Sequence, residues 1–95
     1  MLTCKLTSPE LQTRKMQVIA ALKSKVLESR EVHNGYEYKF ESTDKMLDQL
    51  TEFIKSERLC CDFFDFTISL KKDAFWLLIS GPEGVKEFIK TELEL

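Results

Sequence analysis

The spacing of apolar residues switches between two periods along this chain of 95 residues, and this constrains the fold more than any single motif. Tyr36, Tyr38 and Phe40 alternate with charged residues, which is the period of a half-buried strand. The next segment has helical spacing, with an apolar stripe made of Met46, Leu47, Leu50, Phe53 and Ile54. Residues 64–70 then return to alternation. A chain that mixes both periods in this way is expected to pack helices against a sheet.

The N-terminal part predicts a strand followed by a helix. Residues 2–6 alternate between apolar and polar side chains, and Ser8-Pro9 then provides a cap and a favourable first helical residue. The apolar residues of this helix are expected to be Leu11, Met16, Ile19, Leu22 and Val26. We therefore expect the helix to end near Leu27. Its basic residues Arg14, Lys15, Lys23 and Lys25 do not share a face, which predicts that they are solvated.

A hairpin is predicted in the middle of the chain. Residues 29–33 are expected to pair with residues 36–40 around Asn34-Gly35, because both turn residues tolerate positive φ. Ser42, Thr43 or Asp44 can cap the helix that follows.

The C-terminal part predicts one more strand and a helix. Residues 75–79 are apolar without a break, which is typical of a strand covered on both faces. Residues 81–84 (Gly-Pro-Glu-Gly) end that strand, and a last helix follows. The complete order is β-α-β-β-α-β-β-α. We therefore predict that residues 1–95 form a single α+β domain, in which a two-layer arrangement packs an antiparallel sheet with three helices and the first six elements are ferredoxin-like.

Composition narrows the function classes. The net charge is −2, so binding to nucleic acid is not expected. No apolar run reaches the roughly 20 residues of a membrane-spanning helix, and the first residues lack the apolar core of a signal peptide. These features predict a cytoplasmic protein without a membrane partner. Three cysteines are an odd number, which disfavours a disulfide scaffold and predicts reduced thiols.

Cys60 and Cys61 are adjacent at the end of the middle helix and are the main candidates for chemistry. With about 100° per residue, Cys61 falls near the centre of the apolar stripe, whereas Cys60 lies at its edge and should be half exposed. Glu57 also falls near the centre, where an unpaired carboxylate would be costly to bury. Either this turn of the helix clears the core or Glu57 has a buried partner, which neighbouring Arg58 is badly placed to be.

Several kinds of chemistry are open to this cysteine pair. Reduced adjacent thiols suit a soft ion such as copper(I), mercury(II) or arsenic(III), with Glu57 as a further ligand. The spaced cysteine pairs of a zinc site are missing, and α-carbons about 3.8 Å apart are too close for an ordinary disulfide between Cys60 and Cys61. Free cysteine also packs well as a small apolar residue, so both thiols, and Cys4 as well, could be core. The single histidine, His33, is expected to be exposed beside the turn.

Two blocks of the sequence resemble a known group of proteins. Glu57-Arg58-x-Cys60-Cys61-x-Phe63-Phe64-x-Phe66 and the block Gly81-Pro82-x-Gly84-Val85-Lys86-Glu87-Phe88 are similar to segments of small, uncharacterised bacterial proteins. Similar segments form the tails of MerR-type transcriptional regulators, some of them associated with metal resistance. The resemblance implies no established activity. It suggests an intracellular bacterial accessory domain in which the cysteine pair senses a compound.

Three functions are consistent with these features. The first is a non-enzymatic binding or sensing domain, in which Cys60, Cys61 and Glu57 take a soft metal ion or a thiol-reactive compound; no other cofactor is expected. The second is a structural or homodimer-forming module with both thiols packed. Trp76 and Leu78 would form its contact with another copy, because they occupy the second face of their strand. The third, a thiol enzyme, is disfavoured by the acidic residues that flank the cysteines.

Overall fold

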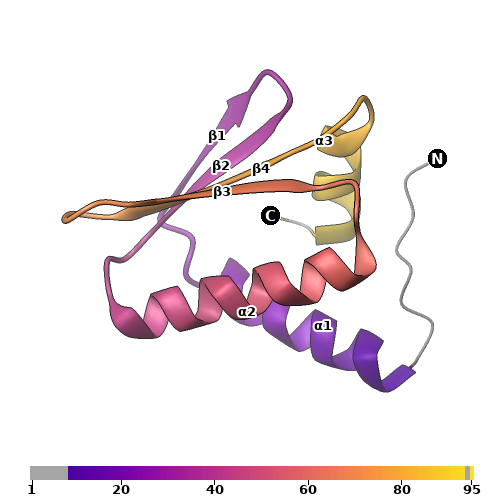
Figure 1. Cartoon of the computed structure of the whole chain (residues 1–95), viewed down its shortest axis with the longest axis horizontal. Coiled ribbons are helices and arrows are strands. Elements are labelled where there is room, and N and C mark those ends of the chain that lie inside the picture. The colour runs from indigo at the N-terminus through magenta and orange to yellow at the C-terminus, as the bar shows by residue number, and fades with distance from the viewer. Residues whose placement is uncertain (1–8, 94) are drawn as a thin grey trace.

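The computed structural model describes residues 9–93 and 95. Its elements follow one another as helices and strands in an α-β-β-α-β-β-α order that ends in a π-helical turn (Figure 1). They are α1 (Pro9–Lys23), β1 (Glu28–Val32), β2 (Gly35–Phe40), α2 (Asp44–Cys60), β3 (Asp65–Leu70), β4 (Phe75–Ser80), α3 (Val85–Phe88) and η1 (Ile89–Leu93). The predicted α+β class with three helices and an antiparallel sheet is confirmed.

The four strands form one sheet in the order β1-β2-β4-β3, and every neighbouring pair is antiparallel. Because β2 and β3 are both antiparallel to β4, they run parallel to each other on either side of it. The connection between them is α2, so β2-α2-β3 is a β-α-β unit with β4 inserted. The strand predicted over residues 2–6 lies outside the described residues, and the ferredoxin-like topology is not confirmed.

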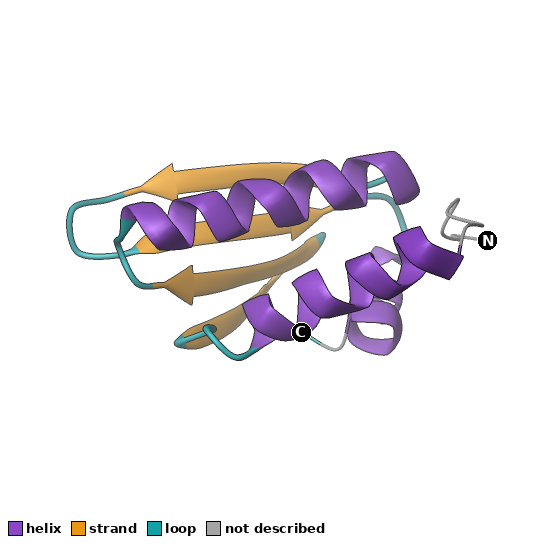
Figure 2. Ribbon diagram, turned by 90° about the horizontal axis from the view of Figure 1, so that it is seen from below, coloured by secondary structure: helices purple, strands orange, loops and turns teal. Residues whose placement is uncertain are grey.

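The molecule has two layers, with the helices on one face of the sheet (Figures 1 and 2). On the covered face, alternate strand residues such as Tyr38, Phe40, Leu77 and Ile79 are buried and pack into one core with residues of all three helices. The opposite face has no helix over it, and Trp76 on that face is only half-buried. The prediction that residues 75–79 are covered on both faces is therefore wrong, because α3 packs on the same side as the other helices.

Helix α1 is shorter than predicted and rotated. It ends at Lys23 rather than near Leu27. The Leu27 N–H already donates to the Lys39 carbonyl at 2.8 Å, so this residue begins the pairing with β2. Met16, which was expected in the apolar stripe, is 70% exposed, whereas Ile19 and Leu22 are buried. No helix among the described residues combines the length and the apolar character that crossing a bilayer requires.

The predicted hairpin is present, but its turn lies one residue earlier than expected. Val32 pairs with Gly35, so His33 and Asn34 form the turn and Gly35 belongs to β2. Gly35 does not have a positive φ. It is required because a Cβ at this position would collide with the backbone of β4 at the Ile79 carbonyl. Close contact between strands, rather than turn conformation, explains this glycine.

Both ends of α2 follow from local chemistry. Thr43 is the N-cap, and its side-chain oxygen accepts a hydrogen bond from the Met46 N–H at 3.1 Å. At the other end the helix stops at Cys60, and Cys61 is the C-cap, with its N–H bonded to the Glu57 carbonyl at 2.6 Å. The two candidate thiols therefore lie on either side of the helix end, directly over the core.

The predicted last helix consists of two parts. Gly84 precedes it with a φ of 94°, a left-handed conformation that favours glycine. Four α-helical residues follow and then widen into the π-helical turn. The apolar residues of this segment are buried as the sequence pattern predicted: Val85, Phe88, Ile89 and Leu93. They belong to the same core cluster as Cys60 and Cys61.

Candidate metal site at the end of helix α2

The last turn of α2 brings three ligand-type side chains together. Glu57, Cys60 and Cys61 each offer one atom, and these atoms all lie within 4.8 Å of one another. Glu57 and Cys60 are completely buried and Cys61 is 1% exposed. The predicted burial of Cys61 is confirmed, but the predicted half-exposure of Cys60 is wrong. Helix α1 packs across the edge of α2 that a wheel of α2 alone leaves open.

The buried partner of Glu57 is Lys15, on α1. The Lys15 Nζ lies 3.6 Å from Glu57 Oε2, and the Lys15 side chain is only 11% exposed. The same nitrogen lies 3.0 Å from the Cys60 sulfur and 3.8 Å from the Cys61 sulfur. Lys15 therefore contacts every member of the group and lies over it as a positively charged cover.

Lys15 is the residue that sequence reasoning missed. It was expected to be solvated like Arg14, Lys23 and Lys25, which are exposed. Its position nevertheless contains a signal, because Lys15 lies four residues before Ile19 and seven before Leu22, so all three share one helical face. A lysine can follow this face because its long apolar stem packs while its amine reaches a polar group.

Glu57 is poorly satisfied in its buried position. Neither of its carboxylate oxygens accepts a hydrogen bond that meets normal geometry, and the ion pair with Lys15 is a long contact. Burial raises the pKa of Glu57 above the usual value of a carboxyl group, an effect that the nearby Lys15 charge and the Cys61 thiol oppose. An acceptor oxygen in this state lacks the partner that buried polar groups normally have.

The environment of Cys61 disfavours nucleophilic chemistry. Burial raises the pKa of the Cys61 thiol to about 12, and the Glu57 charge adds to this effect, whereas Lys15 opposes it. Reactive cysteines need the opposite shift, since the thiolate is the attacking species. Cys61 is therefore a protonated thiol at neutral pH, which disfavours a catalytic role. As a metal ligand it would have to release this proton on binding.

The two sulfurs differ in redox state. Cys61 is a free thiol, whereas Cys60 is disulfide-bonded in this structure. The expectation that both thiols are reduced is therefore not met at Cys60. The Cys61 sulfur lies 3.4 Å from the Cys60 sulfur, so the pair is preassembled. Two-thiol chemistry at this position requires that Cys60 be reduced first.

Among the described residues, the other sequence candidates do not join this group. Cys4 lies outside the described residues. His33 is exposed in the turn between β1 and β2, as predicted. The loop of residues 81–84 forms the tight entry to α3.

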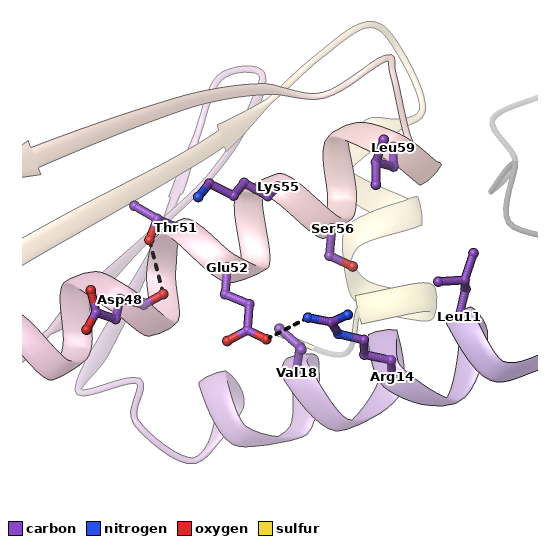
Figure 3. A pocket seen from close by; sticks show the side chains of 9 residues that line it. All are labelled: Leu11, Arg14, Val18, Asp48, Thr51, Glu52, Lys55, Ser56 and Leu59. Carbon is purple, nitrogen blue, oxygen red and sulfur yellow. Dashed lines mark hydrogen bonds and ion pairs between the residues drawn. The ribbon is translucent and has the colours of Figure 1, made fainter.

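A groove of about 450 Å³ lies along the outer side of the contact between α1 and α2 (Figure 3). It is lined by Leu11, Arg14, Val18, Asp48, Thr51, Glu52, Lys55, Ser56 and Leu59. The Arg14–Glu52 ion pair, at 3.6 Å, crosses it. None of the three ligand-type residues lines the groove, so it is separate from the thiol site.

The uncovered face of the sheet carries a second feature. The Arg30 guanidinium lies 4.0 Å from the centre of the Trp76 ring and pairs with Glu37 at 3.2 Å. Lys39 on β2 is paired with Trp76 on β4, and its Nζ lies 6.0 Å from the centre of the same ring. Charged side chains of both signs therefore surround the half-buried Trp76 and Leu78.

Comparison with known proteins gives no relative. No protein-family model, no curated protein and no solved structure matches this chain. The assignment of a function therefore depends on the geometry of the site alone.

Proposed function

We propose that this chain is a non-enzymatic binding or sensing domain, in which Cys60, Cys61 and Glu57 bind a soft metal ion or a thiol-reactive compound. The observation that carries the proposal is the cluster itself, with two sulfurs and a carboxylate within 4.8 Å of one another. Thiolate ligands select soft ions. The resemblance to segments of MerR-type regulators is consistent with this function and stays a prediction.

The unsatisfied carboxylate distinguishes this cluster from simple packing. A fully buried Glu57 with no hydrogen-bond partner costs stability, and a small apolar residue would serve the core better. Cysteines alone are easily explained as core residues, but this carboxylate is not. A bound group that uses one of its oxygens would offset the cost.

Access to the site depends on α1. Residues 9–14 of α1 are all exposed, and the first fully buried residue of this helix is Ile19. Among the described residues, its N-terminal half is therefore held by few apolar contacts, by the contacts of Lys15 with the site and by the exposed Arg14–Glu52 ion pair. A segment with few buried contacts opens at low free-energy cost. Movement of this half would uncover the sulfurs and transmit occupancy of the site to the surface of the molecule.

The test is binding of mercury(II) to the reduced protein, measured by titration with intact-mass detection under native conditions. One ion per chain is expected for the wild type, and the Cys60→Ser variant should lose it. Glu52→Gln is the matched control, because it changes a carboxylate on the exposed side of the same helix. Equal binding by Cys60→Ser would contradict the proposal. Failure of the reduced, folded wild type to bind either mercury(II) or arsenite would contradict it as well.

A second candidate function is formation of a homodimer through the uncovered face of the sheet. Trp76 and Leu78 are half-buried there with no helix above them. Arg30, Lys39 and Glu37 lie on the same face, so the face carries charges of both signs and can complement a second copy of itself. Burial of Trp76 would supply an aromatic anchor of the kind that dominates interfaces.

Sedimentation equilibrium tests this second candidate. A dimeric mass is expected at micromolar concentration, and Trp76→Glu should give a monomer with unchanged circular dichroism. Leu70→Glu is the matched control, because Leu70 is exposed on the other face of the sheet. A monomeric wild type rules out the dimer and leaves the proposed thiol site unaffected.

A further inference from the structure

We propose that the group bound by Cys60 and Cys61 is a trivalent arsenical, such as arsenous acid, rather than a linear or divalent cation. This inference rests on the proposed function, because it names the ligand of the same site. It follows from three properties of the cluster: the separation of the sulfurs, the position of Lys15 and the unsatisfied oxygens of Glu57.

The separation of the sulfurs sets the angle at a bridging atom. Cys60 Sγ and Cys61 Sγ lie 3.4 Å apart. With bonds to sulfur of about 2.3 Å, a bridging atom subtends an angle of about 95°. Copper(I) and mercury(II) favour linear coordination by two thiolates, which would require the sulfurs to separate to roughly 4.6 Å inside a packed core. Trivalent arsenic is pyramidal and takes an angle near a right angle.

The position of Lys15 disfavours a cation. Its Nζ lies 3.0 Å from one sulfur, 3.8 Å from the other and 3.6 Å from Glu57 Oε2, so a positive charge lies close to all three donors. A divalent ion bound to these donors would be repelled by this ammonium at close range, in a site whose donors are buried. Arsenous acid is neutral and adds no charge beside Lys15.

A thiol reductant must first supply two electrons to the disulfide at Cys60, and it is itself oxidised to a disulfide. The reaction of the two thiols with arsenous acid then balances without a further base or oxidant. Each thiol replaces one hydroxide on arsenic, so two As–O bonds break and two As–S bonds form. Each departing hydroxide takes the proton of the thiol that replaces it and leaves as water. Arsenic stays trivalent, and the net charge of the site does not change. The remaining As–OH can donate a hydrogen bond to Glu57, which supplies the partner that this carboxylate lacks.

The experiment compares arsenite with cadmium(II) on the wild-type protein after reduction and removal of the reductant. Arsenite is expected to bind with one arsenic per chain, with a mass gain equal to arsenous acid minus two waters, and at least about tenfold more tightly than cadmium. Cys60→Ser and Cys61→Ser should each weaken arsenite by about 100-fold or more, because either change removes one arm of the chelate. Cys60→Ala and Cys61→Ala repeat the test where a serine variant does not fold.

Lys15→Met separates the charge argument from the geometric one. Loss of the ammonium should tighten cadmium by about tenfold or more and leave arsenite within about threefold. Lys15→Gln, which removes the charge and leaves Glu57 in place, serves where the Met variant is unstable. Tighter binding of cadmium than of arsenite to the wild type, or full arsenite binding by Cys61→Ser, overturns the inference. Mercury binding without arsenite binding overturns it as well but leaves the proposed function standing, whereas failure of both ions removes the proposed function.

Discussion

Two ion pairs join α1 to α2 at the same separation but in opposite environments. Lys15 and Glu57 lie 3.6 Å apart with side chains that are 11% and 0% exposed. Arg14 and Glu52 also lie 3.6 Å apart, but their side chains are 72% and 53% exposed. All four residues come from the same two helices, and the distance between the charged atoms is the same in both pairs. The pairs therefore differ in their exposure to solvent.

The difference lies in what each pair would lose if one partner were removed. Around Arg14 and Glu52, water replaces the missing partner, and exposed pairs contribute little to stability. Glu57 is completely buried, so water cannot replace a missing partner there. An uncompensated buried charge is strongly unfavourable. Neither residue of the buried pair can therefore be removed alone without a large loss of stability. The same buried polar cluster contains the sulfurs of Cys60 and Cys61.

The largest expected effect comes from Lys15→Met, which keeps the length of the side chain and removes its charge. Glu57 would then be buried without a counter-charge, and we expect the free energy of unfolding to fall by about 3 kcal/mol at neutral pH. Urea denaturation followed by circular dichroism measures this change. A decrease in the free energy of unfolding of less than about 0.5 kcal/mol would mean that the buried pair contributes no more to stability than the exposed pair does.

The next effect is the recovery of stability in the double variant Lys15→Met/Glu57→Leu. Replacing a buried ion pair by apolar residues of similar size is often neutral or stabilising, so the double variant should be at least as stable as the wild type. The double-mutant cycle should give a coupling energy of about 2 kcal/mol or more. The matched cycle, with Arg14→Ala and Glu52→Ala, should give about 0.3 kcal/mol.

Much of this arrangement could be predicted from the sequence. Alternation in residues 36–40 and 64–70 and the helical stripe of α2 each predicted the element that is observed, because the apolar period reflects which face is buried. The inward position of Glu57 was likewise predicted from the α2 wheel. These properties belong to one element at a time, and local spacing is enough to predict them.

The rest depends on contacts between elements. Lys15 looked solvated because the rotation of α1 is set by its packing on α2, whereas the predicted stripe placed Met16, which is exposed, against the core. Cys60 looked half exposed because α2 alone does not reveal that α1 covers its edge. The role of Gly35 was misjudged for the same reason, since the carbonyl that excludes a side chain belongs to β4.

The dependence of stability on pH gives a further comparison. The pKa of Glu57 is raised above 4.5 in the folded protein, chiefly by burial, so the folded state binds this proton more tightly than the unfolded chain does. The stabilising contribution is complete below about pH 4.5 and is lost as the pH rises through the folded-state pKa. Lys15 and Cys61 are the titratable groups that face Glu57, and the Cys61 pKa of about 12 lies outside this window.

We therefore expect Glu57→Gln to remove this loss of stability with rising pH. The free energy of unfolding of the variant should decline less than that of the wild type from pH 4.5 upwards, because an amide has no proton to release. Denaturation curves collected at a series of pH values measure the difference. Parallel curves for the two proteins would mean that Glu57 titrates alike in the folded and unfolded states, and the buried cluster would then be open to water.

The smallest expected effect belongs to Arg14→Ala at the exposed pair. Removing this guanidinium should change the free energy of unfolding by no more than about 0.5 kcal/mol, since water solvates Glu52 once its partner is gone. Added salt should reduce even this change, because screening acts on exposed charges first. The same salt should leave the cost of Lys15→Met almost unchanged, as the buried pair is shielded from ions. Denaturation at low and high ionic strength measures both, and a salt-sensitive Lys15→Met would show that solvent reaches the thiol cluster through the contact between α1 and α2.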